Sequence, residues 1–176
     1  MKLNARELRE IPEEEIDKEF LEQERNPLYF ILENIYDTYN IGGIFRLADA
    51  LKVKKIYLCG ETEIPPNPRI KKASIGTYKV VPWEYKKTAE EAIVEVQQQG
   101  VRVYAVEQDT TSVEYTKEAY QFPVALLMGN ETYGVLPETL QKVDQIVEIP
   151  MWGINKSLNV IVSTAIVSYH IVTSTT

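Results

Sequence analysis

The fold expected for this chain is decided by one stretch, Pro123-Val124-Ala125-Leu126-Leu127-Met128-Gly129-Asn130-Glu131-Thr132-Tyr133-Gly134. Its first six residues are apolar and are followed by a glycine, which is typical of a strand buried on both faces of a parallel sheet. The polar residues that follow belong to a loop at the carboxyl end of that strand, where sheets of this kind bind ligands. The stretch therefore predicts both a fold and the place of a site.

The same strand pattern recurs along the chain and alternates with helix-like segments. Further strands are expected at 28–32, 55–60, 80–81, 101–106 and 145–150. Helices are expected at 43–51, 88–99 and 157–172, and an exposed proline-rich loop at 64–68. This alternation predicts an α/β domain, a mostly parallel sheet with helices on both faces.

The N-terminal segment differs from the rest in charge and pattern. Residues 1–25 carry five Lys/Arg against nine Asp/Glu, and Pro12 with the acids after it favours a helix start, so an amphipathic helix is expected over 12–25. Asn26-Pro27 marks a boundary, because a residue before proline avoids helical geometry. We expect an acidic helical extension over 1–25 and one domain over 26–176.

Composition excludes several classes of protein. The 176 residues hold one cysteine, Cys59, and one histidine, His170, which excludes a disulfide framework and leaves no material for a His-based metal site or a Ser-His-Asp triad. There is no apolar run of roughly 18 residues and no apolar segment near Met1, so we expect neither a membrane span nor a secretory signal. The expected location is the cytoplasm.

The charge is distributed unevenly. The net charge is −7, which by itself argues against a nucleic-acid partner, but residues 52–87 carry nine Lys/Arg against three Asp/Glu. This basic segment is compatible with a phosphate-binding surface. Without other evidence, a solvated lysine-rich face is the favoured interpretation of this segment, so charge alone leaves the partner open.

Three loops expected beyond the strand ends, 36–46, 129–134 and 150–159, carry unusual residues. In the first, the glycines at 42 and 43 would form a tight turn into a helix and let backbone approach a ligand. Arg46 would project from the first turn of that helix and clamp a phosphate or a developing oxyanion. The alternative is an arginine paired with a surface carboxylate.

The other two loops pair polar residues with exposed backbone. In 129–134, two glycines flank Glu131, which suits a ligand lying on backbone amides beside a directed carboxylate, although an ordinary turn has the same composition. In 150–159, either Ser157 or Asn159 would cap the final helix. The alternative there is one cap and one surface amide.

In this order and strand context, the three loops resemble the signature of the SpoU/TrmH family of SPOUT RNA methyltransferases. The elements are Asn40-x-Gly-x-x-x-Arg46, Gly129-Asn-Glu-x-x-Gly134 and Ile149-Pro-Met151 followed by Ser157-Leu-Asn159. The stretch from Arg69 to Gly76, followed by Val81-Pro82-Trp83, is also similar to the family's basic segment. The resemblance covers residues 26–172.

The resemblance implies an enzyme that transfers a methyl group from S-adenosylmethionine to a ribose 2′-hydroxyl of RNA. It also implies a homodimer with the active site assembled across the interface, and a deep trefoil knot near the C-terminus. No metal is implied. The chain carries no separate RNA-binding domain ahead of residue 26, so a small folded substrate such as tRNA is expected rather than rRNA.

The resemblance assigns roles residue by residue. The catalytic residues it implies are Arg46, Asn40, Glu131, Ser157 and Asn159. Arg46 would orient the hydroxyl and stabilise its developing charge, since a guanidinium essentially never deprotonates in proteins. The cofactor-binding residues it implies are Val106, Leu127, Met128, Gly129, Asn130, Ile149, Met151, Ser157 and Leu158. For RNA contact we expect Arg69, Lys71, Lys72, Lys79 and Tyr39.

Two other functions compete with this interpretation. One is a non-catalytic RNA-binding or assembly module on the same fold, and the presence of all five polar positions argues against it. The other is a methyltransferase for a small molecule, which the basic segment disfavours. Cofactor binding separates the enzyme from the assembly module, and dependence on a structured RNA separates the two enzymes.

Overall fold

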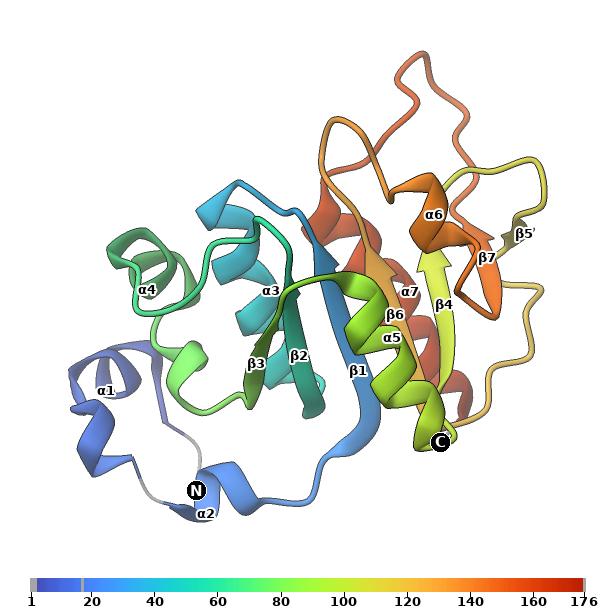
Figure 1. Ribbon diagram of the computed structural model, residues 1–176. Coiled ribbons are helices and arrows are strands. Elements are labelled where there is room, and N and C mark those ends of the chain that lie inside the picture. The colour runs from blue at the N-terminus through green and yellow to red at the C-terminus, as the bar shows by residue number, and fades with distance from the viewer. Residues whose placement is uncertain (1–2, 17, 176) are drawn as a thin grey trace.

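The computed structural model describes residues 3–16 and 18–175, which form a seven-stranded sheet with helices on both sides (Figure 1). The strand order is β3-β2-β1-β6-β4-β7-β5, and all six neighbouring pairs are parallel. The strands are β1 (Asn26–Glu33), β2 (Val53–Cys59), β3 (Trp83–Lys86), β4 (Arg102–Val106), β5 (Val113–Glu114), β6 (Val124–Met128) and β7 (Gln145–Glu148). The predicted α/β class with a parallel sheet is confirmed.

Helices cover both faces of the sheet. The α-helices are α1 (Ala5–Glu10), α2 (Lys18–Glu22), α3 (Thr38–Ala50), α4 (Pro68–Ser74), α5 (Ala89–Gln98), α6 (Pro137–Leu140) and α7 (Val160–Thr175), with 3-10 turns η1 (Glu13–Glu15) and η2 (Thr77–Lys79). Figure 1 shows α5 in front of the sheet and α7 behind it. In the part of the chain described, no helix is long and apolar enough to cross a membrane.

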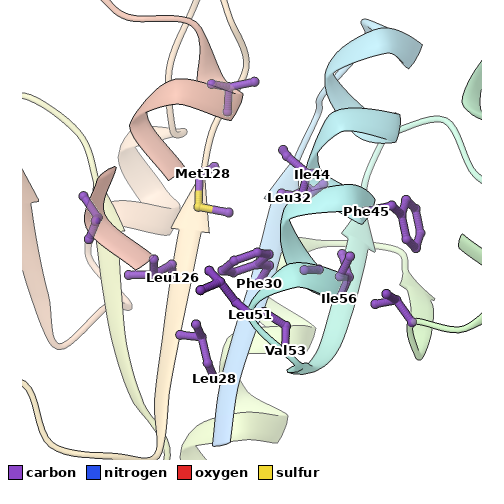
Figure 2. Close-up of a cluster of buried hydrophobic side chains, with 14 of the residues drawn as sticks. Leu28, Phe30, Leu32, Ile44, Phe45, Leu51, Val53, Ile56, Leu126 and Met128 are labelled. Atoms are coloured by element: carbon purple, nitrogen blue, oxygen red, sulfur yellow. The ribbon is translucent and has the colours of Figure 1, made fainter. Parts of the chain in front are cut away.

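Alternate residues of β1 supply the two sides of the core, because successive side chains of a strand point to opposite faces. Phe30 and Leu32 are fully buried in one cluster with Ile44 of α3 and Met128 of β6, as Figure 2 shows. The intervening Ile31 belongs to the cluster packed against α5. A strand buried on both faces explains the unbroken apolar run of the sequence.

The central strand β1 marks the point where the chain changes direction across the sheet. After β1 the chain adds β2 and β3 on one side of it, and the later strands lie on the other side in the order β6, β4, β7 and β5. Open parallel sheets bind ligands outside the carboxyl ends of their strands, at the point where the strand order reverses, so β1 and β6 mark the expected place of a site. Two of the three unusual loops, 36–46 and 129–134, follow these two strands.

The N-terminal segment differs from the helix expected over 12–25. It contains η1 and the short α2 instead, and residue 17 lies outside the described residues. An additional helix, α1, precedes them and is capped by Asn4, whose side chain accepts hydrogen bonds from the backbone of Arg6 and Glu7. The reciprocal bond from Glu7 completes a capping box, a signal present in the sequence.

Two boundaries in the middle of the chain also differ. The expected strand at 80–81 is wrong: Val80 ends η2 in a helical conformation, and the strand begins at Trp83. The expected loop over 64–68 ends at Asn67, which caps α4, because Pro68 occupies the first helical position, where its missing N–H costs nothing. β5 and α6 have only two and four residues and gave no sequence pattern.

The two helices that carry the first and third motifs start at other residues than expected. α3 begins at Thr38, five residues earlier, because Asp37 caps it by accepting a hydrogen bond from the backbone N–H of Tyr39 at 2.8 Å. α7 begins at Val160, three residues later, and Asn159 accepts from the N–H of Ile161 at 2.8 Å. Of the two candidate caps, Asn159 is therefore the one used.

The earlier start of α3 changes the role of its two glycines. Gly42 and Gly43 lie inside the helix, not in a turn that faces a ligand. A Cβ on Gly42 would lie 2.4 Å from the Cβ of Ala73 in α4, and one on Gly43 would lie 2.3 Å from Cδ1 of Ile161 in α7. These glycines let two helices pack closely against α3.

Candidate functional site

A cavity of about 820 Å³ opens at the carboxyl edge of the sheet. Its walls come from the segments that follow four strands, including all three unusual loops. The lining residues are Tyr36, Asp37, Asn40, Val106–Gln108, Met128–Gly134, Ile149, Met151, Asn155–Val160 and Ser163. Its volume falls in the range typical of pockets for ligands of cofactor size.

Three polar side chains, one from each motif, form a chain of hydrogen bonds in the wall of this cavity. The amide of Asn40 donates to Glu131 Oε1 at 3.0 Å, and its own oxygen accepts from Nδ2 of Asn159 at 2.9 Å. Asn40 is only 3% exposed, so both halves of its amide are used inside the protein. The chain of bonds fixes the orientation of all three side chains relative to one another.

This network also connects secondary-structure elements. Asn159 is the cap of α7, and the backbone N–H of Asp37, the cap of α3, points to Glu131 Oε1 at 3.4 Å. The starts of both helices and the loop after β6 are therefore held by one carboxylate and two amides. The polar residues of the three motifs thus hold the segments around the cavity together.

Asn130 folds its own loop. Its side-chain oxygen accepts from the N–H groups of Thr132 and Tyr133 at 2.8 and 3.0 Å, and its amide donates to the carbonyl of Asn34 at 2.8 Å. Gly129 is required beneath this turn, because a Cβ there would lie 2.2 Å from the backbone nitrogen of Val135. The side chain of Asn130 is thus committed to the loop, and a ligand meets chiefly its backbone.

Eight of the nine cofactor-binding candidates line the cavity. Leu127 is the exception, because its fully buried side chain points to the α5 face of the sheet. The apolar residues Val106, Met128 and Ile149 line the cavity together with Gly129. An apolar wall with open backbone groups at its rim suits a purine ring and its polar edge.

Arg46 lies apart from the other catalytic candidates in a single chain. It is in the third turn of α3, not the first, and it is exposed and absent from the lining of the cavity. Because residues three apart share a helix face, Arg46 lies on the same side of α3 as Gly43, which packs against Ile161 at the start of α7. The single chain brings Asn40, Glu131, Ser157 and Asn159 to one cavity, but not Arg46.

Four of the five RNA-contact candidates are accessible. Arg69, Lys71 and Lys72 are exposed on the short helix α4, and the ring of Tyr39 is 69% exposed on α3. Lys79 is different: its ammonium donates to the carbonyl oxygens of Leu8, Arg9 and Ile11 at 3.2, 3.2 and 2.5 Å. These three carbonyls lie at the end of α1, so Lys79 docks the N-terminal segment and has no proton left for a phosphate.

Two carboxylates that the sequence analysis missed support the loop after β6. Glu107 lines the cavity and accepts from the N–H of Val135 at 3.1 Å. Glu33, only 3% exposed, accepts from the N–H of Leu136 at 2.9 Å and the hydroxyl of Thr139 at 2.6 Å. Their position in the sequence could have indicated them, since each acid lies at or directly after the carboxyl end of a strand.

Tyr36 is a further lining residue outside the expected set. Its ring is 49% exposed, and its hydroxyl donates to Glu61 Oε2 at 2.9 Å, which raises the pKa of the phenol and keeps it protonated. Trp152 is 93% exposed in the single chain. Among residues 3–16 and 18–175, no three His, Cys, Asp or Glu side chains are grouped to hold a metal ion.

The family model described as the SpoU rRNA Methylase family matches residues 27–169 of this chain. A tRNA (guanosine(18)-2′-O)-methyltransferase of Escherichia coli (strain K12) is 29% identical over 155 residues, covering 86% of this chain and 66% of that protein. The chain therefore spans just under two thirds of the length of this relative.

Two solved structures are similar over nearly the whole chain. The A. aeolicus TrmH/SpoU tRNA modifying enzyme has a TM-score of 0.79 and 28% identity, covering 97% of this chain and 81% of that one. An AdoMet-bound rRNA methyltransferase from Sinorhizobium meliloti has a TM-score of 0.77 and 30% identity, covering 93% and 59%. Both structures share the fold described above.

Proposed function

The chain belongs to the SpoU rRNA methylase family, and from that premise we propose that it transfers a methyl group from S-adenosylmethionine to a ribose 2′-hydroxyl of RNA. The observation that carries this proposal is the hydrogen-bonded chain Glu131–Asn40–Asn159 in the wall of the large cavity. A single buried amide there links all three motifs. An ordinary turn or helix cap needs no such link.

The cavity fits the methyl donor in size and chemistry. Val106, Met128, Ile149 and Leu158 offer apolar surface for the adenine, and the backbone of Gly129 and the hydroxyl of Ser157 offer hydrogen bonds. When bound, S-adenosylmethionine supplies a methyl carbon already made electrophilic by the sulfonium, so the transfer needs no metal to activate it. Asn40 and Glu131 hold the loops around the donor in place.

Arg46 is the proposed catalytic residue. Its guanidinium orients the ribose hydroxyl and stabilises the negative charge that develops on its oxygen. Because Arg46 lies outside the cavity of its own chain, we place it at the cavity of a second copy. The exposed side of α7, a helix whose start packs against α3 at Gly43, carries Val162 and Tyr169, which are 45% and 48% exposed and suit a homodimer interface.

We propose tRNA as the substrate, with rRNA as the alternative. Both the E. coli relative and the A. aeolicus structure are named for tRNA, while the S. meliloti structure is named for rRNA. Arg69, Lys71 and Lys72 on α4 form a compact cationic face for RNA phosphates. Because tRNA is the proposed substrate, we propose the cytoplasm as the location of the protein.

The test is methyl transfer from labelled S-adenosylmethionine to unmodified tRNA transcripts, with wild type, Arg46→Ala and Arg46→Lys. Wild type is expected to leave dinucleotides that resist alkaline hydrolysis, the signature of a 2′-O-methyl group. Arg46→Ala is expected to lose at least about a hundredfold in rate, as on removal of one oxyanion donor, with cofactor affinity unchanged. Arg46→Lys separates charge from the forked donor geometry.

Each outcome decides between functions. Transfer that does not depend on Arg46 keeps the activity and removes the proposed role of this residue. Transfer to rRNA but not tRNA selects the alternative substrate. Cofactor binding without transfer to either RNA contradicts the proposed enzyme, and absence of cofactor binding favours an assembly module.

A further inference from the structure

The stretch from α4 through η2 carries positive charges only. Residues 68–79 hold Arg69, Lys71, Lys72 and Lys79 and no Asp or Glu. Lys71 and Lys79 line the same cavity of about 320 Å³. Burial, and second to it the charge of Lys71, lower the pKa of the Lys79 ammonium. Two ammonium groups that repel each other in this way favour an anion beside them, such as a phosphate of RNA.

The N-terminal segment lies against these two ammonium groups instead. Residues 3–16 contain five Glu and two Arg. Figure 1 shows α1 next to α4 at the same end of the molecule, and the segment supplies the other described residues that line the cavity. These residues are Arg9, Glu10, Ile11, Pro12, Glu13 and Glu14. An acidic segment of the chain itself thus takes the position in which RNA phosphates would meet Lys71 and Lys79.

Hydrogen bonds attach the segment to η2. The Lys79 ammonium donates to three carbonyl oxygens at the end of α1, at 3.2, 3.2 and 2.5 Å. The last carbonyl groups of a helix have no partner inside it and carry partial negative charge. The hydroxyl of Tyr78 donates to the carboxylate of Glu13. Both contacts place negative groups of the segment on residues of η2.

Little apolar surface supports these polar contacts. Of residues 3–16, only Leu8 has a buried side chain. One buried leucine does not offset the conformational entropy that is lost when the whole segment becomes ordered, and a helix of six residues is not stable alone. The segment is therefore held mainly by its polar and charged contacts, and a stronger polyanion is able to replace it.

We infer that residues 3–16 form an acidic strap that competes with RNA for Lys71 and Lys79, so that RNA binds this face fully only when it displaces the strap. The inference rests on the proposed function, in which the cations of α4 bind RNA phosphates. Displacement frees the Lys79 ammonium from the carbonyl groups and removes the carboxylates of Glu13 and Glu14 from this face. The strap lowers the affinity for all RNA, and only an RNA with enough phosphate contacts replaces it.

The first variant loosens the strap without a change of charge. Leu8→Ala removes the only buried side chain of the strap, and Leu21→Ala is the matched control because Leu21 is 43% exposed. Binding of an unmodified tRNA transcript is measured by filter binding at fixed salt. Leu8→Ala is expected to lower the Kd by at least about threefold, because the fraction of the protein with a free RNA face rises. Leu21→Ala is expected to leave the Kd unchanged.

The second pair of variants changes charge. Glu13→Gln with Glu14→Gln neutralises two carboxylates that line the cavity, whereas Glu15→Gln with Glu24→Gln neutralises two exposed carboxylates that do not. Both double variants change the net charge equally, so general attraction to RNA rises comparably in both. The first is expected to bind tRNA about three- to tenfold more tightly than the second, the size expected for two weakened surface charge pairs. KM for tRNA is expected to fall by the same factor, while kcat at saturating tRNA stays unchanged.

Hydrogen exchange in the strap measures displacement directly. In wild type, the backbone amides of residues 3–11 are expected to exchange faster when tRNA is bound. Linkage requires this, because RNA must loosen the strap by the same factor by which the strap weakens RNA binding. Unchanged exchange would mean that the strap stays in place, and slower exchange would mean that the segment itself binds RNA. Either result overturns the inference.

The outcomes separate the inference from the proposed function. Binding of tRNA that both strap variants leave unchanged or weaken overturns the inference and leaves the proposed function standing. If both variants tighten binding and no RNA is methylated, the strap stands and the proposed enzyme fails. If neither wild type nor any variant binds tRNA or rRNA, both are overturned.

Discussion

At the scale of single residues, Asn40 holds together the segments that form the wall of the cavity. Its amide has one donor side toward Glu131 and one acceptor side toward Asn159, at 3.0 and 2.9 Å. No other side chain of similar size donates and accepts in this geometry, because an aspartate has no donor and a leucine has neither. The sequence indicated all three residues as site candidates, but nothing in their spacing showed that they bond to each other.

We predict that Asn40→Asp disrupts this joint, because it sets a second carboxylate against Glu131 in a buried place. The free energy of unfolding is expected to fall by about 1–3 kcal/mol, and methyl transfer to fall with it. Urea unfolding and transfer rates measure the two effects. Asn67→Asp is the matched control, since Asn67 only caps α4 and aspartate caps equally well.

A compensating change tests the same joint more directly. In the double variant Asn40→Asp with Glu131→Gln, the glutamine donates where the asparagine did. The pair is expected to recover most of the lost stability, giving a coupling energy of the size seen for contacting residues. Additive losses in the double variant would contradict the proposed joint.

At the scale of elements, α3 shows how packing overrides a local signal. A Gly-Gly pair is typical of a turn, yet both glycines lie within the helix. The cap at Asp37 and the buried Ile41, Ile44 and Phe45, spaced three and four residues apart, stabilise a helix through this region. The pair is tolerated because two other helices approach within contact distance at those positions.

Gly42 and Gly43 are predicted to respond differently to alanine. At Gly42 a Cβ meets the backbone nitrogen of Ser74 at 2.8 Å, so α4 must move, and a net loss of about 1–3 kcal/mol in stability is expected. At Gly43 a Cβ meets only the flexible end of the Ile161 side chain, which can move. The higher helix propensity of alanine adds about 1 kcal/mol of stability and offsets the cost of that movement. Thermal unfolding of both variants measures the difference.

The movement of α4 gives this prediction a second readout. α4 carries Arg69, Lys71 and Lys72, so Gly42→Ala is also expected to weaken binding of RNA, measured by filter binding at fixed salt. Gly153→Ala is the control, because a Cβ there meets nothing within 4 Å. Equal effects at residues 42 and 43 would show that the contact with α4 does not matter.

The N-terminal segment is an element whose attachment the sequence did not indicate. Leu8 is 8% exposed and its carbonyl lies against Gly76, Tyr78 donates a hydrogen bond to Glu13, and Lys79 caps the end of α1. At the boundary, the guanidinium of Arg25 is buried and donates to the carbonyls of Phe20, Val53 and Val80. We propose that residues 1–25 are an appendage of the domain that begins at Asn26.

At the scale of the whole molecule, Arg46 is separated from the cavity in which the other catalytic candidates lie. Helix α7 contains no Asp, Glu, Lys or Arg, and a helix without such charges is usually well covered by other parts of a protein. Its outer residues Val162 and Tyr169 are instead exposed in the single chain. A second copy packed there would cover this surface and approach Arg46 at the same time.

An activity test distinguishes a dimer that shares its active sites from a dimer of two chains that each hold a complete site. Arg46→Ala and Glu131→Ala chains, each inactive alone, are mixed and allowed to exchange. If Arg46 serves the partner's cavity, each mixed dimer contains one intact site, and about a quarter of wild-type activity is expected. Sedimentation of Tyr169→Glu, expected to be monomeric and inactive, measures the interface independently; an inactive mixture would place Arg46 at its own chain's site.

By itself the sequence determined the α/β class, the parallel sheet and the positions of three polar loops, because the apolar runs and the residues after each strand are local properties of the chain. Only the tertiary structure decided what those positions do. Asn40 forms hydrogen bonds with Glu131 and Asn159, which lie 91 and 119 positions later in the sequence. The glycines of α3 allow two other helices to pack closely, and the ammonium of Lys79 is bound to carbonyl oxygens at the end of α1. Each of these outcomes depends on contacts between distant segments, and such contacts arise only when the elements pack.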